Sequence, residues 1–141
     1  MMILPVMLYC SKIFIDLPNC HKLKFEDIQN RAMQIVYGSI NSSEWPSINE
    51  IRNRNCAHEV FKCLHGLAPM PLQKSFIRVS HSQNTRGNNV NLSLPKVKTE
   101  AGRKRFAYQG SIIFNKLPND LKTEQPLLRY KNTCKSINLD F

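Results

Sequence analysis

The amino-acid sequence predicts a small, mainly α-helical domain with one or two short β-strands and long polar loops. Two observations carry this prediction. Apolar residues recur at the three-and-four spacing of a helix face in four stretches, residues 25–37, 48–64, 106–117 and 127–137. Glycine or proline residues stand where three of these helices should end. With 141 residues, 42% of them apolar, the chain is long enough to pack as one compact unit.

The amino-terminal part contains an apolar run and the first predicted helix. We expect the apolar residues 3–15 to form a short buried element. They do not resemble a signal peptide, because they lack a positive n-region and a cleavage site. The helix over residues 25–37 should end at Gly38. Its predicted core face consists of Phe25, Ile28, Ala32, Ile35 and Val36.

The second predicted helix has a start signal and a stop signal. A polar loop over residues 39–47 precedes it, with Trp45 as an apolar anchor, and Ser47 with Glu50 forms a capping box. Gly66 favours a left-handed C-cap. The core face consists of Ile48, Ile51, Ala57, Val60, Phe61 and Leu64. We expect the helical hairpin 25–66 to build the amino-terminal half of the core.

The carboxy-terminal half begins with a polar loop and ends with a helix. Residues 79–91 contain few apolar residues and many turn formers, which predicts an exposed loop. The alternation of Val90, Leu92 and Leu94 predicts one short strand. Pro126 suits a helix start, and the apolar face of that last helix consists of Leu127, Tyr130, Cys134 and Ile137.

The densest positive charge lies between the predicted strand and the helix 106–117. Five cations fall within ten positions and are opposed only by Glu100: Lys96, Lys98, Arg103, Lys104 and Arg105. The helix that follows has Phe106, Gly110, Ile113, Phe114 and Leu117 on one face. Pro118 ends it, because proline has no backbone N–H group to donate.

Cations at the start of this helix face the positive end of the helix dipole, which is unfavourable. Two explanations are open. The helix begins earlier, with Thr99 as N-cap and Glu100 in the first turn, and the cations form a solvated face. Alternatively, a phosphate binds at the helix start, held by backbone N–H groups together with Arg and Lys side chains.

The charge distribution indicates the class of partner. The net charge is +10, of which +1 falls in residues 1–70 and +9 in residues 71–141. Such asymmetry favours a polyanion, and RNA or DNA is preferred over a membrane because no strongly basic helix carries a bulky apolar face. Arg86 in the polar loop is a further candidate contact, unless that loop is simply solvated.

The cysteines and histidines do not predict a metal site or a cofactor. Five cysteines are an odd number without the spacing of a disulfide scaffold, so we expect reduced thiols in an intracellular protein. Cys56, His58, Cys63 and His65 are close in sequence. On one helix, however, Cys56 and Cys63 lie roughly 10 Å apart along the axis, too far for one tetrahedral ion.

Three segments resemble the carboxy-terminal region of non-LTR, jockey-like retrotransposon reverse transcriptase polyproteins. They are NTRGN at 84–88, LPKVKTEAGRKRFAYQGSIIFNKLPNDLK at 94–122, and YK at 130–131. The matching positions are Thr85, Arg86, Pro95, Thr99, Gly102, Arg103, Phe106, Tyr108, Gly110, Asn115, Leu117, Pro118 and Lys131. Phe114 stands where Trp is usual and Tyr130 where Phe is usual. Arg105 replaces a usual small hydroxyl residue.

The resemblance implies a fragment of a larger polymerase protein. Residues 1–38 would be a remnant of the region that follows the polymerase palm, residues 39–78 the second half of the helical hairpin, and residues 79–141 a basic motif region. The intact family protein is an RNA-directed DNA polymerase. The paired aspartates with which a polymerase holds two metal ions are missing from this sequence, so we expect no enzymatic activity.

Two functions follow as expectations. The first is non-catalytic contact with RNA or DNA phosphates, independent of base sequence, in the nucleus or the cytoplasm. The residues expected to make it are Arg86, Lys96, Lys98, Arg103, Lys104 and Arg105. The alternative is a packing domain that only supports the missing polymerase domains and has no nucleic-acid role of its own.

Overall fold

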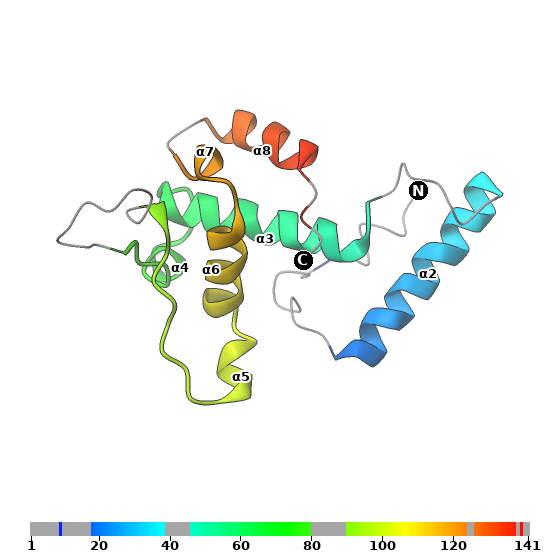
Figure 1. Cartoon of the computed structure of the whole chain (residues 1–141), viewed down its shortest axis with the longest axis horizontal. Coiled ribbons are helices and arrows are strands. Elements are labelled where there is room, and N and C mark those ends of the chain that lie inside the picture. The colour runs from blue at the N-terminus through cyan, green and yellow to red at the C-terminus, as the bar shows by residue number, and fades with distance from the viewer. Residues whose placement is uncertain are drawn as a thin grey trace.

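The fold is mainly α-helical, as predicted, and a long central helix organises it. This computed structural model describes residues 9, 18–38, 46–79, 90–123, 126–137 and 139. The described helices are α2 (Asn19–Tyr37), α3 (Ile48–Leu64), α4 (Met70–Gln73), α5 (Glu100–Arg103), α6 (Phe106–Lys116), α7 (Asn119–Lys122) and α8 (Leu127–Ser136). Helix α3 lies at the centre, α8 runs beside it and α6 crosses it (Figure 1).

Several predictions concern residues outside these ranges. Trp45, Arg86 and most of the apolar run 3–15 are not among the described residues. Within that run only Tyr9 is described, and its side chain is exposed rather than buried.

Helix α3 begins and ends where its local signals predict. The Ser47 hydroxyl oxygen accepts a hydrogen bond from the Glu50 N–H group at 3.1 Å, which caps the first turn. At the other end, Gly66 has a φ of 73°, and the Leu67 N–H group donates to the Lys62 carbonyl at 2.9 Å. This backward bond across a left-handed glycine is the Schellman motif.

The main core lies between α3, α6 and α8. Its buried members are Cys56, Ala57, Val60, Phe61, Cys63, Phe76, Leu92, Ile113, Phe114, Leu117, Leu121, Tyr130, Cys134 and Leu139. The Phe61 and Tyr130 rings stack with their centroids 3.9 Å apart, and the Tyr130 hydroxyl donates to the Ala57 carbonyl at 3.3 Å. The predicted core faces of α6 and α8 are therefore confirmed.

Helix α2 corrects two predictions. It begins at Asn19, six residues before the predicted start, although it ends at Gly38 as expected. Its predicted face is largely wrong, because Ile28, Ile35 and Val36 are 46%, 85% and 53% exposed. The buried side chains of α2 are Gln29, Ala32 and Met33.

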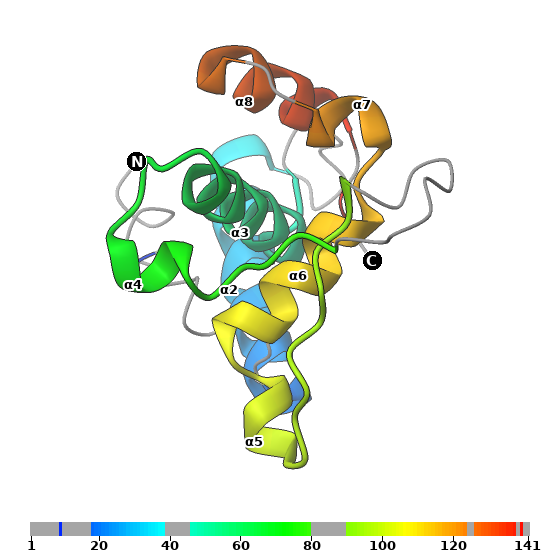
Figure 2. The same cartoon turned by 90° about the vertical axis from the view of Figure 1, so that its left-hand side faces the viewer.

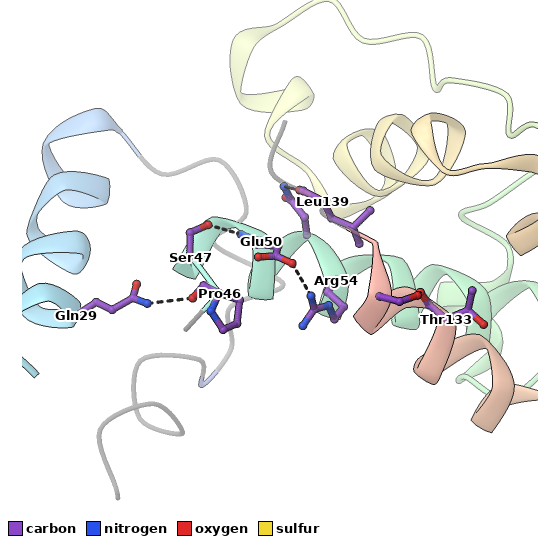
Figure 3. A network of polar contacts seen from close by, with 9 residues as sticks. Gln29, Pro46, Ser47, Glu50, Arg54, Thr133 and Leu139 are labelled. Atoms are coloured by element: carbon purple, nitrogen blue, oxygen red, sulfur yellow. Dashed lines mark hydrogen bonds and ion pairs between the residues drawn. The ribbon is translucent and has the colours of Figure 1, made fainter. Parts of the chain in front are cut away.

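Two contacts accompany the buried face that α2 presents in place of the predicted one. The Gln29 side-chain amide donates to the Pro46 carbonyl at 3.0 Å, just before α3 begins (Figure 3). The Arg52 guanidinium lies 4.9 Å from the centre of the Phe25 ring. None of the described α2 residues belongs to the main core, so the predicted hairpin 25–66 does not build half of it.

The predicted strand is reduced to one bridge. Arg78 and Leu92 pair in antiparallel fashion, and the Val79 N–H group donates to the Asn91 carbonyl at 2.9 Å. Leu92 is buried, whereas Leu94 is exposed. The alternation of Val90, Leu92 and Leu94 therefore predicted the position of the bridge correctly. Only Leu92, however, packs into the core.

Candidate nucleic-acid interface

The predicted cations lie on a projection that we call the basic arm, residues 94–105. The chain leaves Leu92 in an extended conformation, runs away from the helical body to α5, and returns through α6. Figures 1 and 2 both show α5 at the far end of this projection. The structure thus brings all five cations of this segment to one protruding part of the molecule.

The cations of the basic arm face solvent. All five side chains are exposed: Lys96, Lys98, Arg103, Lys104 and Arg105. Arg103 makes a long ion pair with Glu100, with 3.8 Å between nitrogen and oxygen, and both side chains are more than half exposed. Such a pair contributes little to stability and is easily exchanged for another anion. The other four make no ion pair with any described residue.

The structure bears on the first of the two explanations for the start of this helix. Thr99 is an N-cap, as one of them predicts, and its hydroxyl oxygen accepts from the Gly102 N–H group at 3.1 Å. The helix that it starts ends after one turn, at Arg103. Helix α6 then begins separately at Phe106, with Arg105 as N-cap and no side-chain cap bond from the described residues. Lys104 and Arg105 therefore lie between the end of α5 and the uncapped start of α6, whereas Lys96 and Lys98 precede α5.

Close packing shapes the turn of the basic arm. A Cβ atom at Gly102 would lie 3.1 Å from the Val97 Cβ atom and 3.2 Å from the Thr99 hydroxyl oxygen. That separation is tighter than ordinary van der Waals contact, so glycine allows the extended segment to lie against α5. The two lysines of that segment, Lys96 and Lys98, are adjacent in sequence to Val97.

Two residues that the sequence did not assign to the site hold the base of the basic arm. Asn115 contacts both backbone groups of Leu92: its side-chain oxygen accepts from the Leu92 N–H group at 2.7 Å, and its side-chain nitrogen donates to the Leu92 carbonyl at 2.9 Å. Lys122 is almost fully buried and donates to the Asn91 side chain at 2.9 Å and to the Asn115 carbonyl at 2.8 Å. Burial lowers the pKa of Lys122.

The sequence contained a signal for only one of these residues. Asn115 belongs to the sequence motif over residues 94–122, but that motif does not identify the residue that Asn115 contacts. Lys122 looks like an ordinary charged residue after a proline. Its neighbours in space are distant in the chain, so spacing alone could not have found it.

Three cations of α3 are engaged in other ways. Arg54 pairs with Glu50 and Lys62 pairs with Glu59, in each case within α3 (Figure 3 shows the first pair). Arg52 is buried, and burial lowers its pKa. The basic arm differs from these positions because its charges are both concentrated and exposed.

The histidines and cysteines do not form a metal centre in the part of the chain that is described. No group of three or more His, Cys, Asp or Glu side chains there is arranged to hold an ion. Cys56 and Cys63 are buried in the core. The Nδ1 atom of His65 lies 2.9 Å from the Phe61 carbonyl, consistent with a helix-end hydrogen bond.

The comparisons place the chain in no family. Among the described helices, none combines the length and the apolar character that crossing a membrane requires. Comparison with protein families, with curated proteins and with solved structures gives no match to this chain.

Proposed function

We propose that this chain is a non-catalytic nucleic-acid-binding module that contacts RNA or DNA phosphates through the basic arm. One observation carries the proposal: five cations lie exposed on a single projection, and four of them have no ion-pair partner among the described residues. Exposed Lys and Arg side chains neutralise phosphates and release counterions, which makes this class of binding strong at low salt.

The local backbone is compatible with phosphate binding. Helix α6 starts at the arm without a side-chain cap, and the first N–H groups of a helix favour an anion. Contacts of this kind position a protein on nucleic acid without reading its bases. We therefore propose binding that is independent of base sequence, with Arg86, which lies outside the described residues, as an additional contact.

The sequence resemblance supports the same proposal at the family level. We infer a carboxy-terminal part of a non-LTR retrotransposon reverse transcriptase, acting inside the cell in the nucleus or the cytoplasm. The residues with which a polymerase would bind catalytic metal ions are missing from this sequence, so the proposed role is binding and not synthesis.

The first experiment changes the charge of the arm alone. Replacing Arg103, Lys104 and Arg105 together by Gln should flatten the slope of log affinity against log salt by about 2 to 3 units. The full set of five should contribute roughly −3.5 on single strands and −4.5 on duplex. Filter binding of RNA and of DNA at several salt concentrations measures both slopes.

A matched variant controls for net charge. Lys74, Arg129 and Lys135 are exposed cations away from the arm, and replacing all three by Gln changes the net charge equally. The proposal requires this control to keep most of the parent's affinity and salt slope. If both triple variants behave alike, the basic arm is not the binding site.

A second candidate function is favoured by one observation. Several motif residues serve the fold: Gly102 and Gly110 allow close packing, Asn115 holds Leu92, and Leu117 is buried. This favours a packing domain that supports missing polymerase domains. Unchanged RNA and DNA binding by the arm triple variant would leave this second candidate as the better proposal.

A further inference from the structure

Two polar side chains fasten the chain just before the basic arm begins. The Asn115 side chain of α6 bonds to both backbone groups of Leu92, at 2.7 Å and 2.9 Å. The Lys122 ammonium group of α7 donates to the Asn91 side chain at 2.9 Å, and it also donates to the Asn115 carbonyl at 2.8 Å. Asn115 and Lys122 therefore form one connected network, which we call the arm clamp.

A short antiparallel pairing holds the same place along its other edge. The Asn91 carbonyl accepts from the Val79 N–H group at 2.9 Å, and the Ser93 N–H group donates to the Ile77 carbonyl at 2.8 Å. Backbone groups of successive residues in an extended chain point to opposite edges, so those of Leu92 are left to face α6. The three residues that precede the arm are therefore hydrogen-bonded along both edges.

The outgoing limb of the arm has no comparable support. Between Leu94 and Lys98 no backbone hydrogen bond to another described residue is present, and the close packing of Val97 is with Gly102 of the arm itself. Figure 2 shows this limb running away from the helical body to α5. Its direction is therefore set where it leaves the body, at residues 91–93, and where the chain returns through α6.

Lys122 cannot act on a phosphate directly. Its side chain is 3% exposed, and its described acceptors are amide and backbone carbonyl oxygens. A buried ammonium group is tolerated only when hydrogen bonds replace the water that it loses, so the oxygens of Asn91 and Asn115 hold it in one position. Any effect of Lys122 on binding must therefore pass through the residues that it holds.

We propose that Asn115 and Lys122 are positioning residues for nucleic-acid binding, which fix the direction of the basic arm before a partner arrives. This inference rests on the proposed function of the arm. A fixed arm loses little conformational freedom when its cations contact phosphates, whereas a loose arm must be ordered at the expense of affinity. The number of phosphates neutralised is the same in both cases, so the clamp governs affinity and leaves the salt slope unchanged.

Clamp variants test this separation of affinity from salt slope. Asn115→Ala keeps the net charge and removes both bonds to Leu92. Its affinity for single-stranded RNA and for a short DNA duplex should fall at least about tenfold, while the slope of log affinity against log salt changes by less than about one unit. Lys122→Met should act in the same way, and the double variant should lose little more than either single variant because the two side chains form one network.

Two controls separate positioning from charge and from stability. Lys135→Met removes an exposed cation of α8, as a match for the charge lost in Lys122→Met, and should bind nearly as tightly as the parent. Cys134→Ala weakens the core from α8, because Cys134 is fully buried, and should also keep its affinity at a temperature where circular dichroism shows every variant folded. An affinity loss in Asn115→Ala no greater than that in Cys134→Ala would overturn the inference. So would a salt slope as flat as that of the arm triple variant, since phosphate contacts themselves would then be lost.

A measurement on the parent chain does not depend on the folding of any variant. The amides of Leu92 and Ser93 should exchange slowly in the free chain, and addition of the single-stranded RNA should not slow them further. Amides that become protected only after the RNA is added would show that the partner orders the arm, which contradicts a clamp that acts beforehand.

The same experiments distinguish this inference from the proposed function. If the triple variant of Arg103, Lys104 and Arg105 flattens the salt slope while Asn115→Ala binds like the parent, the arm binds nucleic acid without the clamp and only this inference fails. If the triple variant itself binds with the affinity and salt slope of the parent, the proposed function fails and the inference fails with it.

Discussion

At the scale of single residues, His58 is the histidine with the most unusual environment among those described. It lies on α3 with its ring edge against Tyr130 of α8, 5.8 Å between centroids. Its Nε2 atom is buried and has no hydrogen-bond partner in the described structure. Burial lowers the pKa of His58 to about 4, and the charges of Lys131, Arg54 and Lys62 act in the same direction, against Glu59.

This shift predicts a loss of stability in mild acid. The unfolded chain binds a proton at His58 near pH 6.5, whereas the folded protein resists it until about pH 4. Unfolding free energy should therefore be highest above pH 6.5 and fall as the pH drops towards 4, by on the order of 1 to 2 kcal/mol after allowance for partial solvent screening. Urea unfolding at several pH values measures the decline.

The variant His58→Gln should reduce the acid-induced decline. His21→Gln provides the control, because His21 is an exposed histidine on α2 and its replacement should leave the pH profile unchanged. A parent protein whose unfolding midpoint does not move between pH 7 and 4 would show that His58 is freely protonated in the folded state.

The residues of the candidate site show which information the sequence contains. Exposure of Lys96, Lys98 and Arg103 could be anticipated, because a dense run of like charge cannot be buried without partners. The burial of Lys122 could not be anticipated from the sequence. Its acceptors come from Asn91 and Asn115, and only the folded chain brings their oxygens to one ammonium group.

At the scale of elements, helix ends marked by a local signal were predicted correctly, whereas the buried face of α2 was not. Ser47, Gly66 and Pro118 act on their own neighbours, and each marks a helix end in the structure. The buried face of α2 depends instead on what packs against it. The Gln29 side-chain amide donates a hydrogen bond to the Pro46 carbonyl at the start of α3, and no hydrophobic pattern contains that information.

The crossing of α6 over α3 depends on a glycine, which yields a prediction. A Cβ atom at Gly110 would lie only 2.8 Å from the Val60 Cγ2 atom and 3.2 Å from the Phe76 ring. Gly110→Ala gains about 1 kcal/mol of helix propensity but should lose more through overpacking, since Val60 is fully buried. We expect a net destabilisation of about 1 to 2 kcal/mol in urea unfolding.

A double-mutant cycle isolates that contact. Val60→Ala removes the methyl group that the new Cβ would meet, so adding Gly110→Ala to it should cost less than adding the same change to the parent. Strict additivity of the two changes would mean that the helices separate without resistance, and that Gly110 does not set their distance.

At the scale of the whole molecule, the structure has a core around α3 and two parts that extend from it. Phe61, Phe114 and Tyr130 are fully buried where α3, α6 and α8 meet. The carboxy-terminal segment is also tied to α3, because the Asn53 side chain donates to the Leu139 carbonyl at 2.8 Å (Figure 3). No described residue of the basic arm or of α2 belongs to this core. The helix content was predictable from the apolar periodicity of the sequence. Which of the helices contribute side chains to the core was not.

This arrangement predicts that α2 opens without unfolding the core. Its described contacts to α3 are few, and partly exposed apolar side chains contribute less to stability than buried ones, so its amides should exchange through a local opening. We expect hydrogen exchange in α2 to be at least about tenfold faster than in the middle of α3. Val60→Ala should then speed exchange across α3 and α6 by weakening the core, while changing the rates in α2 much less. Equal protection of α2 and α3, with both responding alike to Val60→Ala, would show instead that the molecule unfolds as one cooperative unit.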